Sequence, residues 1–224
     1  TTRFHLNGVF FEHIENGIMR MTATDGHRLS FVDNEVFQQL PEFKRGVIIP
    51  RKGLSELRKL LDSVNGTVGL AFERGYVFAK FPSALGDTYV FVRLIDAEYP
   101  DYRLVVPKTT EKLVKLDKDE FNAALKRVSL FANEKSRGVK LAIQSGQITI
   151  SSSNSEMGEA TEEMDIEYSG EPMEIGFNSK YLLESIAVNP SQKLEFHLKD
   201  RLSPGILRGV SNPNHTYVIM PMRV

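Results

Sequence analysis

The 224-residue sequence contains no cysteine and no tryptophan. Without cysteine there are no disulfides, no thiolate nucleophiles and no zinc sites with cysteine ligands, which fits a reducing, cytoplasmic location. No run approaches the roughly 18 apolar residues that a transmembrane helix needs. Charge of one sign is not in excess either, because 28 Lys and Arg residues stand against 29 Asp and Glu residues. A near-neutral chain is not expected to bind nucleic acid indiscriminately, although a local basic surface can be balanced by acid elsewhere.

The stretch Thr22–Leu29 concentrates more side chains of possible function than any other short segment of the chain. Before it, Met19, Met21 and Ala23 alternate with polar residues, which predicts a strand. Asp25-Gly26 then predicts a tight turn, because glycine takes a positive φ without a Cβ clash. We expect this turn to present Thr24, His27, Arg28 and Leu29 together.

Apolar periodicity predicts the remaining elements. Strands are expected near residues 6–12, 47–49, 67–73, 75–81, 87–95, 138–144, 146–152, 159–167, 173–177, 192–199, 205–210 and 215–222. A helix should open at Pro50 with Leu54, Leu57, Leu60 and Leu61 as its apolar face. A second helix, 118–132, should be capped by Asp117 with Glu120 three residues later, and a third should span 179–188.

Two halves of the sequence resemble each other. Asn7-Gly8-Val9 aligns with Arg137-Gly138-Val139, and Thr22–Asp25 aligns with Ser151–Asn154. Pro50 aligns with Asn178, and both halves end on Tyr-Val, at Tyr89 and Tyr217. This spacing predicts an internal repeat. Only the second half has a helix before its Arg-Gly-Val, so we expect the first half to lack its leading strand and helix, as in a fragment of a longer chain.

Six motifs in order make the chain resemble the bacterial DNA polymerase III beta subunit, the sliding clamp family. They are Thr-Asp-Gly-His-Arg-Leu at 24–29, Pro-Arg-Lys-Gly at 50–53, Tyr-Pro-Asp-Tyr-Arg at 99–103, Asn-Glu-Lys with Arg-Gly-Val at 133–139, Glu-Ile-Gly-Phe-Asn at 174–178 and Met-Pro-Met-Arg-Val at 220–224. The resemblance implies an α+β DNA-clamp fold, built of repeated domains of antiparallel sheets whose helices line the interior of a ring. It implies a middle domain at 1–103, without its first strand and helix, and a C-terminal domain at 104–224.

The resemblance also implies a pocket between these domains for short peptides of DNA polymerase III alpha, other polymerases and the clamp-loader delta subunit. Carried over residue by residue, the pocket would comprise Leu6, Thr24, Gly26, His27, Arg28, Leu29, Pro100, Leu104, Val105, Asn178, Tyr181, Leu202, Pro204, Val218, Ile219, Met220, Pro221, Met222 and Arg223. Three residues depart from the family pattern: Leu104 replaces a common Arg, Ser136 a common aromatic residue and Pro204 a common small polar residue. These departures bear on which partners are preferred.

Sequence-independent contact with duplex DNA is the other implied function. The residues expected to face DNA are Arg3, His5, Lys52, Lys59, Lys126 and Arg127. The intact protein is expected to be a homodimer that uses Leu130 and Phe131 at its interface, although packing under the adjacent strand would also explain these two side chains.

Two other functions fit the residues less well. A hydrolase could use Asp25, His27 and Arg28, with Ser30 nearby, but one turn does not supply a nucleophile, a base and an orienting group. A structural adaptor that never touches DNA is the second alternative. The remaining histidines have no metal-ligand spacing, and the acidic run at 156–165 is typical of a solvated strand edge. We therefore expect no catalytic residue, metal or cofactor.

Overall fold

A computed structural model describes residues 4–14, 17–35, 46–64, 66–84 and 86–223. The chain divides into two compact units. The first contains the residues up to Asp25 and Phe31–Asp101, and the second contains Gly26–Ser30 and Tyr102–Val224. Among the described residues, no helix is long and apolar enough to cross a membrane.

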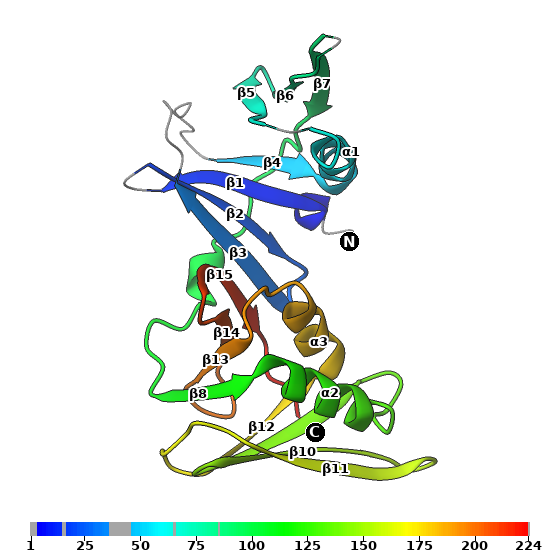
Figure 1. The fold of residues 1–224 in the computed structure, drawn as a ribbon, viewed down its shortest axis with the longest axis vertical. Helices are drawn as coiled ribbons and strands as arrows, with labels where there is room; N and C mark the ends of the chain where they lie inside the picture. Colours follow the sequence, from blue (N-terminus) through cyan, green and yellow to red (C-terminus); the bar gives the residue numbers. More distant parts are fainter. Residues whose placement is uncertain (1–3, 15–16, 36–45, 65, 85, 224) are drawn as a thin grey trace. The chain divides into compact units, whose positions relative to one another are not determined.

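The first unit begins with a short 3-10 helix, η1 (Phe4–Leu6), and is built around an antiparallel sheet. Its strands are β1 (Gly8–Ile14), β2 (Ile18–Thr24), β3 (Arg28–Glu35) and β4 (Val47–Pro50), in the order β4-β1-β2-β3. The β2–β3 turn is the predicted one, and Gly26 adopts the required positive φ of 89°. Helix α1 (Arg51–Leu61) follows β4 directly and packs on β4 and β1 (Figure 1).

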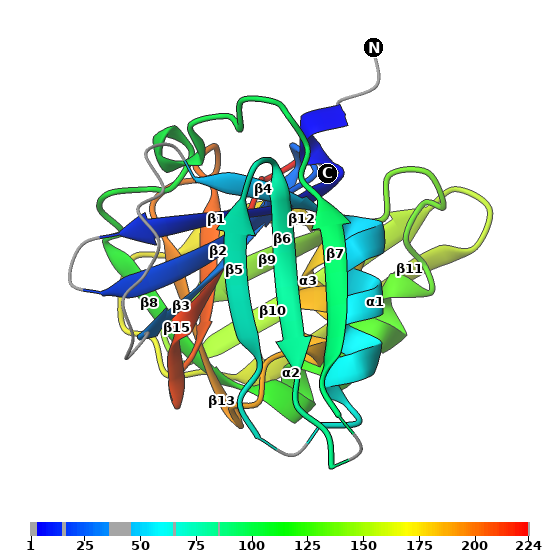
Figure 2. The same ribbon diagram turned by 90° about the horizontal axis from the view of Figure 1, so that it is seen from above.

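A second, three-stranded sheet completes this unit. Its strands are β5 (Gly69–Glu73), β6 (Tyr76–Phe81) and β7 (Thr88–Arg93), which lie side by side in Figure 2. One core joins the two sheets and α1 through Phe11, Ile49, Leu57, Val77 and Val92. The apolar face predicted for α1 is therefore correct at Leu57, with Leu54 and Leu60 packed beside the core, but wrong at Leu61, which is half exposed because the helix ends there.

The second unit contains two sheets and two helices. It begins with a short 3-10 helix, η2 (Tyr102–Leu104), and strand β8 (Lys112–Asp117). One sheet has the order β11-β10-β9-β12, from β9 (Gly138–Gln144), β10 (Gln147–Asn154), β11 (Gly158–Asp165) and β12 (Met173–Asn178). β13 (Lys193–Leu198), β14 (Gly205–Gly209) and β15 (Asn212–Ile219) lie in the order β15-β14-β13-β8.

Helices α2 (Lys118–Ser129) and α3 (Ser179–Ala187) pack against each other and against these strands (Figure 1). Phe121, Phe177 and Phe196 have no exposed surface in a core that spans both sheets. The predicted N-cap of α2 is confirmed, because the Asp117 carboxylate accepts hydrogen bonds from the backbone N–H groups of Asp119 and Glu120 at 2.9 and 3.0 Å.

The internal repeat is confirmed by the strand order. The sheet β4-β1-β2-β3 of the first unit has the same connectivity as β12-β9-β10-β11 of the second, and each fourth strand leads directly into a helix. The register agrees with the sequence alignment, since Gly8 pairs with Pro50 as Gly138 pairs with Asn178. The hairpins β5-β6-β7 and β13-β14-β15 correspond in the same way.

Several predicted boundaries are wrong for local reasons. α2 ends at Ser129 rather than at residue 132, so Leu130 and Phe131 lie in the following turn. Pro50 is the N-cap of α1 and not its first residue. The strand expected at 6–12 begins at Gly8, and the last strand is Asn212–Ile219 instead of 215–222. Strand β8 was not delimited from the sequence. Thr22 is one of the polar residues that alternate with Met19, Met21 and Ala23, yet it is fully buried.

Candidate functional site

An apolar cavity in the second unit gathers several of the predicted pocket residues. Its volume is about 380 Å³, and its lining includes Leu104, Val105, Pro204 and Met220. Leu104 is 83%, Val105 43% and Met220 38% exposed. Side chains this apolar are usually buried, so their exposure around one cavity makes it the candidate interaction surface. Lys108 and Lys199 also line the cavity and add positive charge to it.

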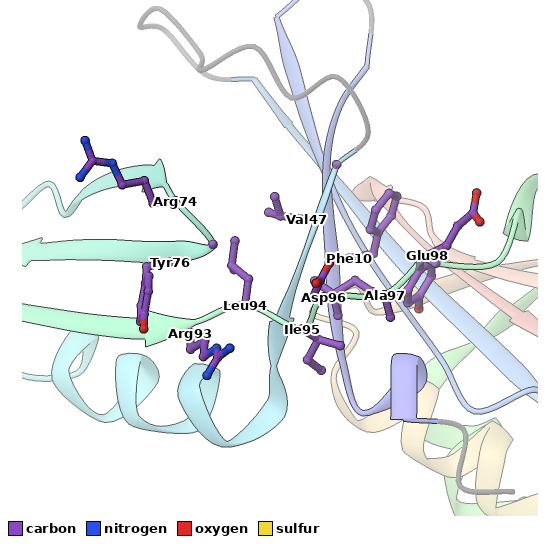
Figure 3. A pocket seen from close by; sticks show the side chains of 14 residues that line it. Phe10, Val47, Arg74, Tyr76, Arg93, Leu94, Ile95, Asp96, Ala97 and Glu98 are labelled. Atoms are coloured by element: carbon purple, nitrogen blue, oxygen red, sulfur yellow. The ribbon is translucent and has the colours of Figure 1, made fainter.

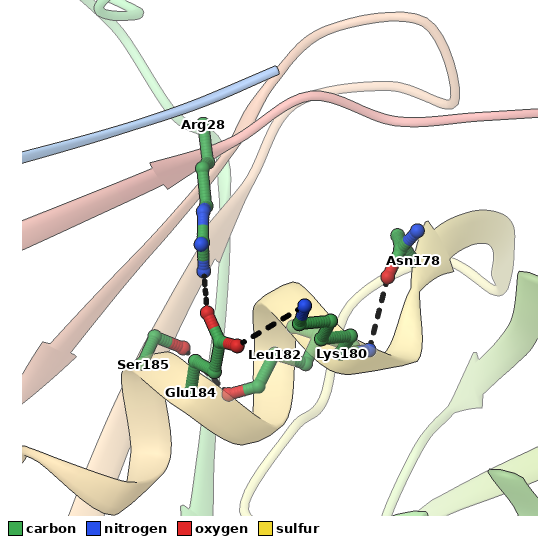
Figure 4. Close-up of polar contacts among 6 residues, drawn as sticks. All are labelled: Arg28, Asn178, Lys180, Leu182, Glu184 and Ser185. Carbon is green, nitrogen blue, oxygen red and sulfur yellow. Dashed lines mark hydrogen bonds and ion pairs between the residues drawn. The ribbon is translucent and has the colours of Figure 1, made fainter. Parts of the chain in front are cut away.

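A polar cluster forms between α3 and the Gly26–Ser30 segment. Nη1 of Arg28 donates to Oε2 of Glu184 at 2.5 Å, and Lys180 approaches the same carboxylate at 3.7 Å (Figure 4). The Arg28 guanidinium also lies 4.6 Å from the centre of the Tyr181 ring. The rings of His27 and Tyr181 are nearly parallel, with centroids 6.4 Å apart. Arg28, His27 and Tyr181, which the family resemblance places in one pocket, are therefore neighbours.

The C-terminal segment connects the cavity to this cluster. The Met220 N–H donates to the His27 carbonyl at 3.0 Å, and the Met222 N–H donates to the Gly176 carbonyl at 2.9 Å. Both bonds hold the segment after β15 at fixed positions along the unit. Of the other predicted wall residues, Leu29, Val218 and Ile219 are buried and offer almost no surface to a ligand.

Asn178 has a structural role that the sequence analysis did not assign. It is the N-cap of α3, where its Oδ1 accepts from the Lys180 N–H at 3.0 Å (Figure 4). Its Nδ2 donates to the Ser136 carbonyl at 3.0 Å. Both ends of the amide are thus engaged within the unit, which fixes the start of the helix that carries Tyr181 and Glu184.

The remaining predicted pocket residues are divided between the two units and differ in exposure. Leu6, Thr24 and Pro100 belong to the first unit, where Leu6 lies in η1 and Thr24 ends β2. In the second unit, Leu202 is largely exposed, Gly26 and Arg223 are exposed, and Pro221 is half-buried.

The residues expected to face DNA are distributed over η1 and two helices. His5 lies in η1, not on a strand, and Arg3 lies outside the described residues. Lys52 and Lys59 are exposed on α1, where Lys59 pairs with Glu56 at 2.8 Å. Lys126 and Arg127 are exposed on α2, and Arg127 forms a two-point ion pair with Glu162 of β11. The hydrogen bonds from Arg127 lower the pKa of Glu162.

Of the expected dimer-interface residues, Leu130 is 68% exposed and Phe131 is half-buried.

A serine–histidine contact joins the Gly26–Ser30 segment to β15. Ser30 Oγ and His215 Nε2 are 2.9 Å apart, and the Tyr217 hydroxyl is 2.9 Å from His215 Nδ1. Burial raises the pKa of Tyr217 to about 12, so the third group stays neutral and cannot stabilise an imidazolium as a carboxylate would. Burial also lowers the pKa of His215, which favours a neutral ring. The arrangement is a hydrogen-bonded link between strands, and it involves Ser30 with a histidine other than the His27 of the hydrolase hypothesis.

A larger cavity of about 1020 Å³ occupies the first unit (Figure 3). Its lining includes the stacked Phe10 and Tyr99 rings, 4.8 Å apart, and charges of both signs such as Arg93 and Asp96. It contains none of the residues predicted for the peptide pocket. Over the described ranges, no three histidines or carboxylates are grouped as metal ligands would be.

Sequence reasoning missed Glu184 and the Ser30–His215 pair. Glu184 could have been found, because it follows Lys180 by four residues and Tyr181 by three, which places all three on one helix face. The contact between Ser30 and His215 spans 185 positions and has no local signal.

Comparison with known proteins identifies the family. Residues 1–101 match the central domain of the DNA polymerase III beta subunit, and residues 103–223 match its C-terminal domain. The chain is 38% identical over 226 residues to a beta sliding clamp of Caulobacter vibrioides, covering 100% of this chain and 59% of that protein. For a beta sliding clamp of Escherichia coli K12 the identity is 36% over 222 residues, with 99% and 59% covered.

Solved structures agree with this match. A beta sliding clamp of C. crescentus, with PEG bound to a putative beta-motif tethering region, superposes with a TM-score of 0.93 at 38% identity, covering 100% of this chain and 59% of that one. A sliding clamp of Pseudomonas aeruginosa bound to griselimycin gives 0.91 at 36%, with the same coverage. The chain thus spans about 59% of the length of its curated relatives. The α+β architecture, the repeated topology and both domain matches establish that this chain belongs to the DNA polymerase III beta subunit family, the sliding clamps.

Proposed function

We propose that this chain is the partner-binding part of a DNA polymerase processivity factor, and that the cavity of the second unit receives short peptides. The observation that carries the proposal is the exposure of Leu104, Val105 and Met220 around one cavity of about 380 Å³. The partners are DNA polymerase III alpha, other polymerases and the clamp-loader delta subunit. Two related clamps, one bound to griselimycin and one with PEG at a putative beta-motif tethering region, support a ligand-accepting surface in this family.

The residue chemistry suits apolar peptides with few polar anchors. The thioether of Met220 is flexible and polarisable, so it adapts to different partner side chains. Arg28 and Tyr181 supply a cation and a ring next to His27, whose carbonyl accepts from Met220, and Glu184 fixes the orientation of the guanidinium. Leu104 and Pro204 make this cavity more apolar than the family pattern, which favours a partner with an apolar anchor at this position.

A labelled peptide of the type Gln-Leu-x-Leu-Phe tests the proposal by fluorescence anisotropy. We expect micromolar affinity, which corresponds to roughly −8 kcal/mol. Deleting Met220–Val224 should weaken binding at least about tenfold, or about 1.4 kcal/mol. Because this deletion also removes two backbone hydrogen bonds of the second unit, Met220→Ala is the sharper variant, and Met157→Ala is its control, since Met157 is exposed on the β10–β11 hairpin. Unchanged affinity in both the deletion and Met220→Ala would refute the proposal.

For the intact protein we propose a head-to-tail homodimer that encircles duplex DNA. A ring holds DNA by topology, so weak attraction between phosphates and cations such as Lys52, Lys59 and Lys126 is sufficient. The exposure of Leu130 supports an interface at the end of α2. Phe131→Ala should weaken the intact dimer without unfolding the second unit, which sedimentation and circular dichroism would measure together. A heterologous contact needs two different surfaces, so a stable dimer of this chain alone would contradict the proposed interface.

We propose no catalytic activity. His27→Ala should reduce peptide affinity, while hydrolase, transferase and nuclease assays show no turnover in either form. A metal-dependent activity that disappears in His27→Ala would favour the hydrolase hypothesis. Peptide binding without any association with DNA by the intact protein would favour the adaptor.

A further inference from the structure

The outer face of the β5-β6-β7 sheet carries an aromatic cluster that the proposed function does not use. Successive side chains of a strand point to opposite faces. On the inner face, Val77, Ala79 and Phe81 are buried in the core of the first unit. We call the outward-facing set the aromatic face; it consists of Tyr76, Phe78, Lys80, Tyr89, Phe91 and Arg93. Phe91 is 63% and Tyr89 57% exposed, which is unusual for rings of this size.

The register arranges these side chains in three rows. Phe78 pairs with Phe91 in the central row, and their rings meet edge to face at 5.1 Å. Tyr76 pairs with Arg93 at one end, where β6 begins and β7 ends (Figure 3), and Lys80 pairs with Tyr89 at the other. Each end row therefore joins a tyrosine to a cation, and the rows are about 7 Å apart because alternate residues of a strand are separated by that distance.

The neighbouring strand leaves the rings accessible. The positions of β5 that lie beside this face are Gly69, Ala71 and Glu73, which pair with Lys80, Phe78 and Tyr76. Gly69 has no side chain, and Ala71 has a single methyl group next to Phe78. A flat ligand can therefore approach the central rings from the β5 side as well as from the front.

Both ends of the aromatic face carry cations, and two of the three have an acidic partner beside them. Lys80 lies 5.9 Å from the centre of the Tyr89 ring and is paired with Asp87 at 2.7 Å. Within the described part of the chain, Arg93 has no ion-pair partner. Arg74 lies in the β5–β6 turn close to the Arg93 end, with its side chain 88% exposed and in contact with Glu73 at 3.1 Å.

We propose that the aromatic face binds single-stranded nucleic acid. Exposed rings on a small sheet provide stacking surfaces for unpaired bases, and this stacking tolerates any sequence. Cations at both ends of the rows suit the phosphates of a strand that crosses the sheet. A second copy of this chain or an apolar protein segment would bury the rings equally well, but an apolar segment would leave Arg93 without a matching charge. The combination of rings and flanking cations thus favours nucleic acid. This proposal does not depend on the peptide cavity of the second unit.

Fluorescence anisotropy with a labelled 20-nucleotide oligo(dT) tests the proposal on the chain as it stands. Alanine substitution of a stacking ring ordinarily weakens binding by about 5- to 150-fold, so Phe91→Ala should weaken it at least about fivefold. Phe91→Leu should weaken it similarly, because leucine keeps apolar area but has no π face, and Phe91→Tyr should retain most of the affinity. Leu113→Ala is the control, since Leu113 is 40% exposed on β8 and belongs to the second unit, away from the aromatic face. Arg93→Gln should lower the slope of log affinity against log salt by about 0.7.

Three outcomes would overturn the proposal. The first is no saturable binding of oligo(dT) at low salt. The second is binding that Phe91→Leu leaves unchanged, which would indicate an apolar contact or a different site. The third is self-association of the chain that Phe91→Ala abolishes, which would show that the face belongs to an interface between copies. Measuring the Gln-Leu-x-Leu-Phe peptide with the same preparations separates failure here from failure of the proposed function, because Phe91→Ala should leave peptide affinity unchanged.

Discussion

Replacing Asn178 by alanine should loosen the helix that carries the candidate site. Loss of an N-cap side chain costs about 1 kcal/mol, with a range of about 0.5–2. The second bond, from Nδ2 to the Ser136 carbonyl, contributes about another 1 kcal/mol by the usual value for a protein hydrogen bond. We therefore expect Asn178→Ala to lower the local stability of α3 by about 2 kcal/mol, and Asn178→Ser to recover about half, because serine can still cap.

Hydrogen exchange of the α3 amides is the appropriate assay, since a chain of two units need not unfold in one step. Glu184→Ala is the control on the same helix. It removes an ion pair whose side chains are 33% and 46% exposed, and such surface pairs contribute about 0–1 kcal/mol. If Asn178→Ala accelerates exchange no more than Glu184→Ala, the capping argument is wrong. If Asn178→Ser keeps the cap but loses peptide binding, Asn178 contacts the peptide directly, as the family resemblance implies.

Two further predictions concern buried and titrating groups. Thr22 is fully buried, and within the described residues its hydroxyl has no hydrogen-bond partner. Thr22→Val should therefore be neutral or should stabilise the first unit by up to about 1 kcal/mol, measured by urea unfolding. A decrease in stability of more than about 1 kcal/mol would show that the hydroxyl has a partner. Arg127→Gln should raise the pKa of Glu162 towards its ordinary value, because the hydrogen bonds of Arg127 now lower it. A lowered carboxyl pKa stabilises the fold at pH values above the ordinary pKa, and this stability is lost as the pH falls through the lowered pKa. A ¹³C NMR titration measures the pKa of Glu162 directly. If Arg127→Gln leaves that pKa unchanged, the ion pair is contradicted.

The elements with local signals were predictable. Asp25-Gly26 specified its turn because only glycine takes the required φ easily, and Asp117 specified the start of α2 because its carboxylate accepts from two nearby N–H groups. The repeat was predictable because pairs of strands in both halves keep the same register. Each of these features depends on residues close in sequence, or on a pattern that occurs twice.

The features that could not be predicted depend on tertiary context. The apolar spacing of Leu61 continues that of Leu57, yet the helix ends at Leu61 and the core does not reach it. An asparagine can cap a helix or bind a peptide, so the residue type of Asn178 does not tell which role it has. Its two hydrogen bonds within the unit identify it as a cap. Among the residues expected in the pocket, the burial of Leu29, Val218 and Ile219 follows from their places in strands and not from their apolar character.

The repeat also provides an internal comparison for the aromatic face. On β14 and β15, Leu207, Tyr217 and Ile219 belong to the core of the second unit, so the face that points away from this core carries the pairs Ile206–Val218 and Arg208–Thr216. Neither pair contains an aromatic ring, and Ile206 and Val218 are buried. The same topology is therefore completed in the second unit without aromatic rings on this face of the two strands. Exposed rings are not required by the fold, and their presence in the first unit alone is what a binding surface specific to that unit would produce.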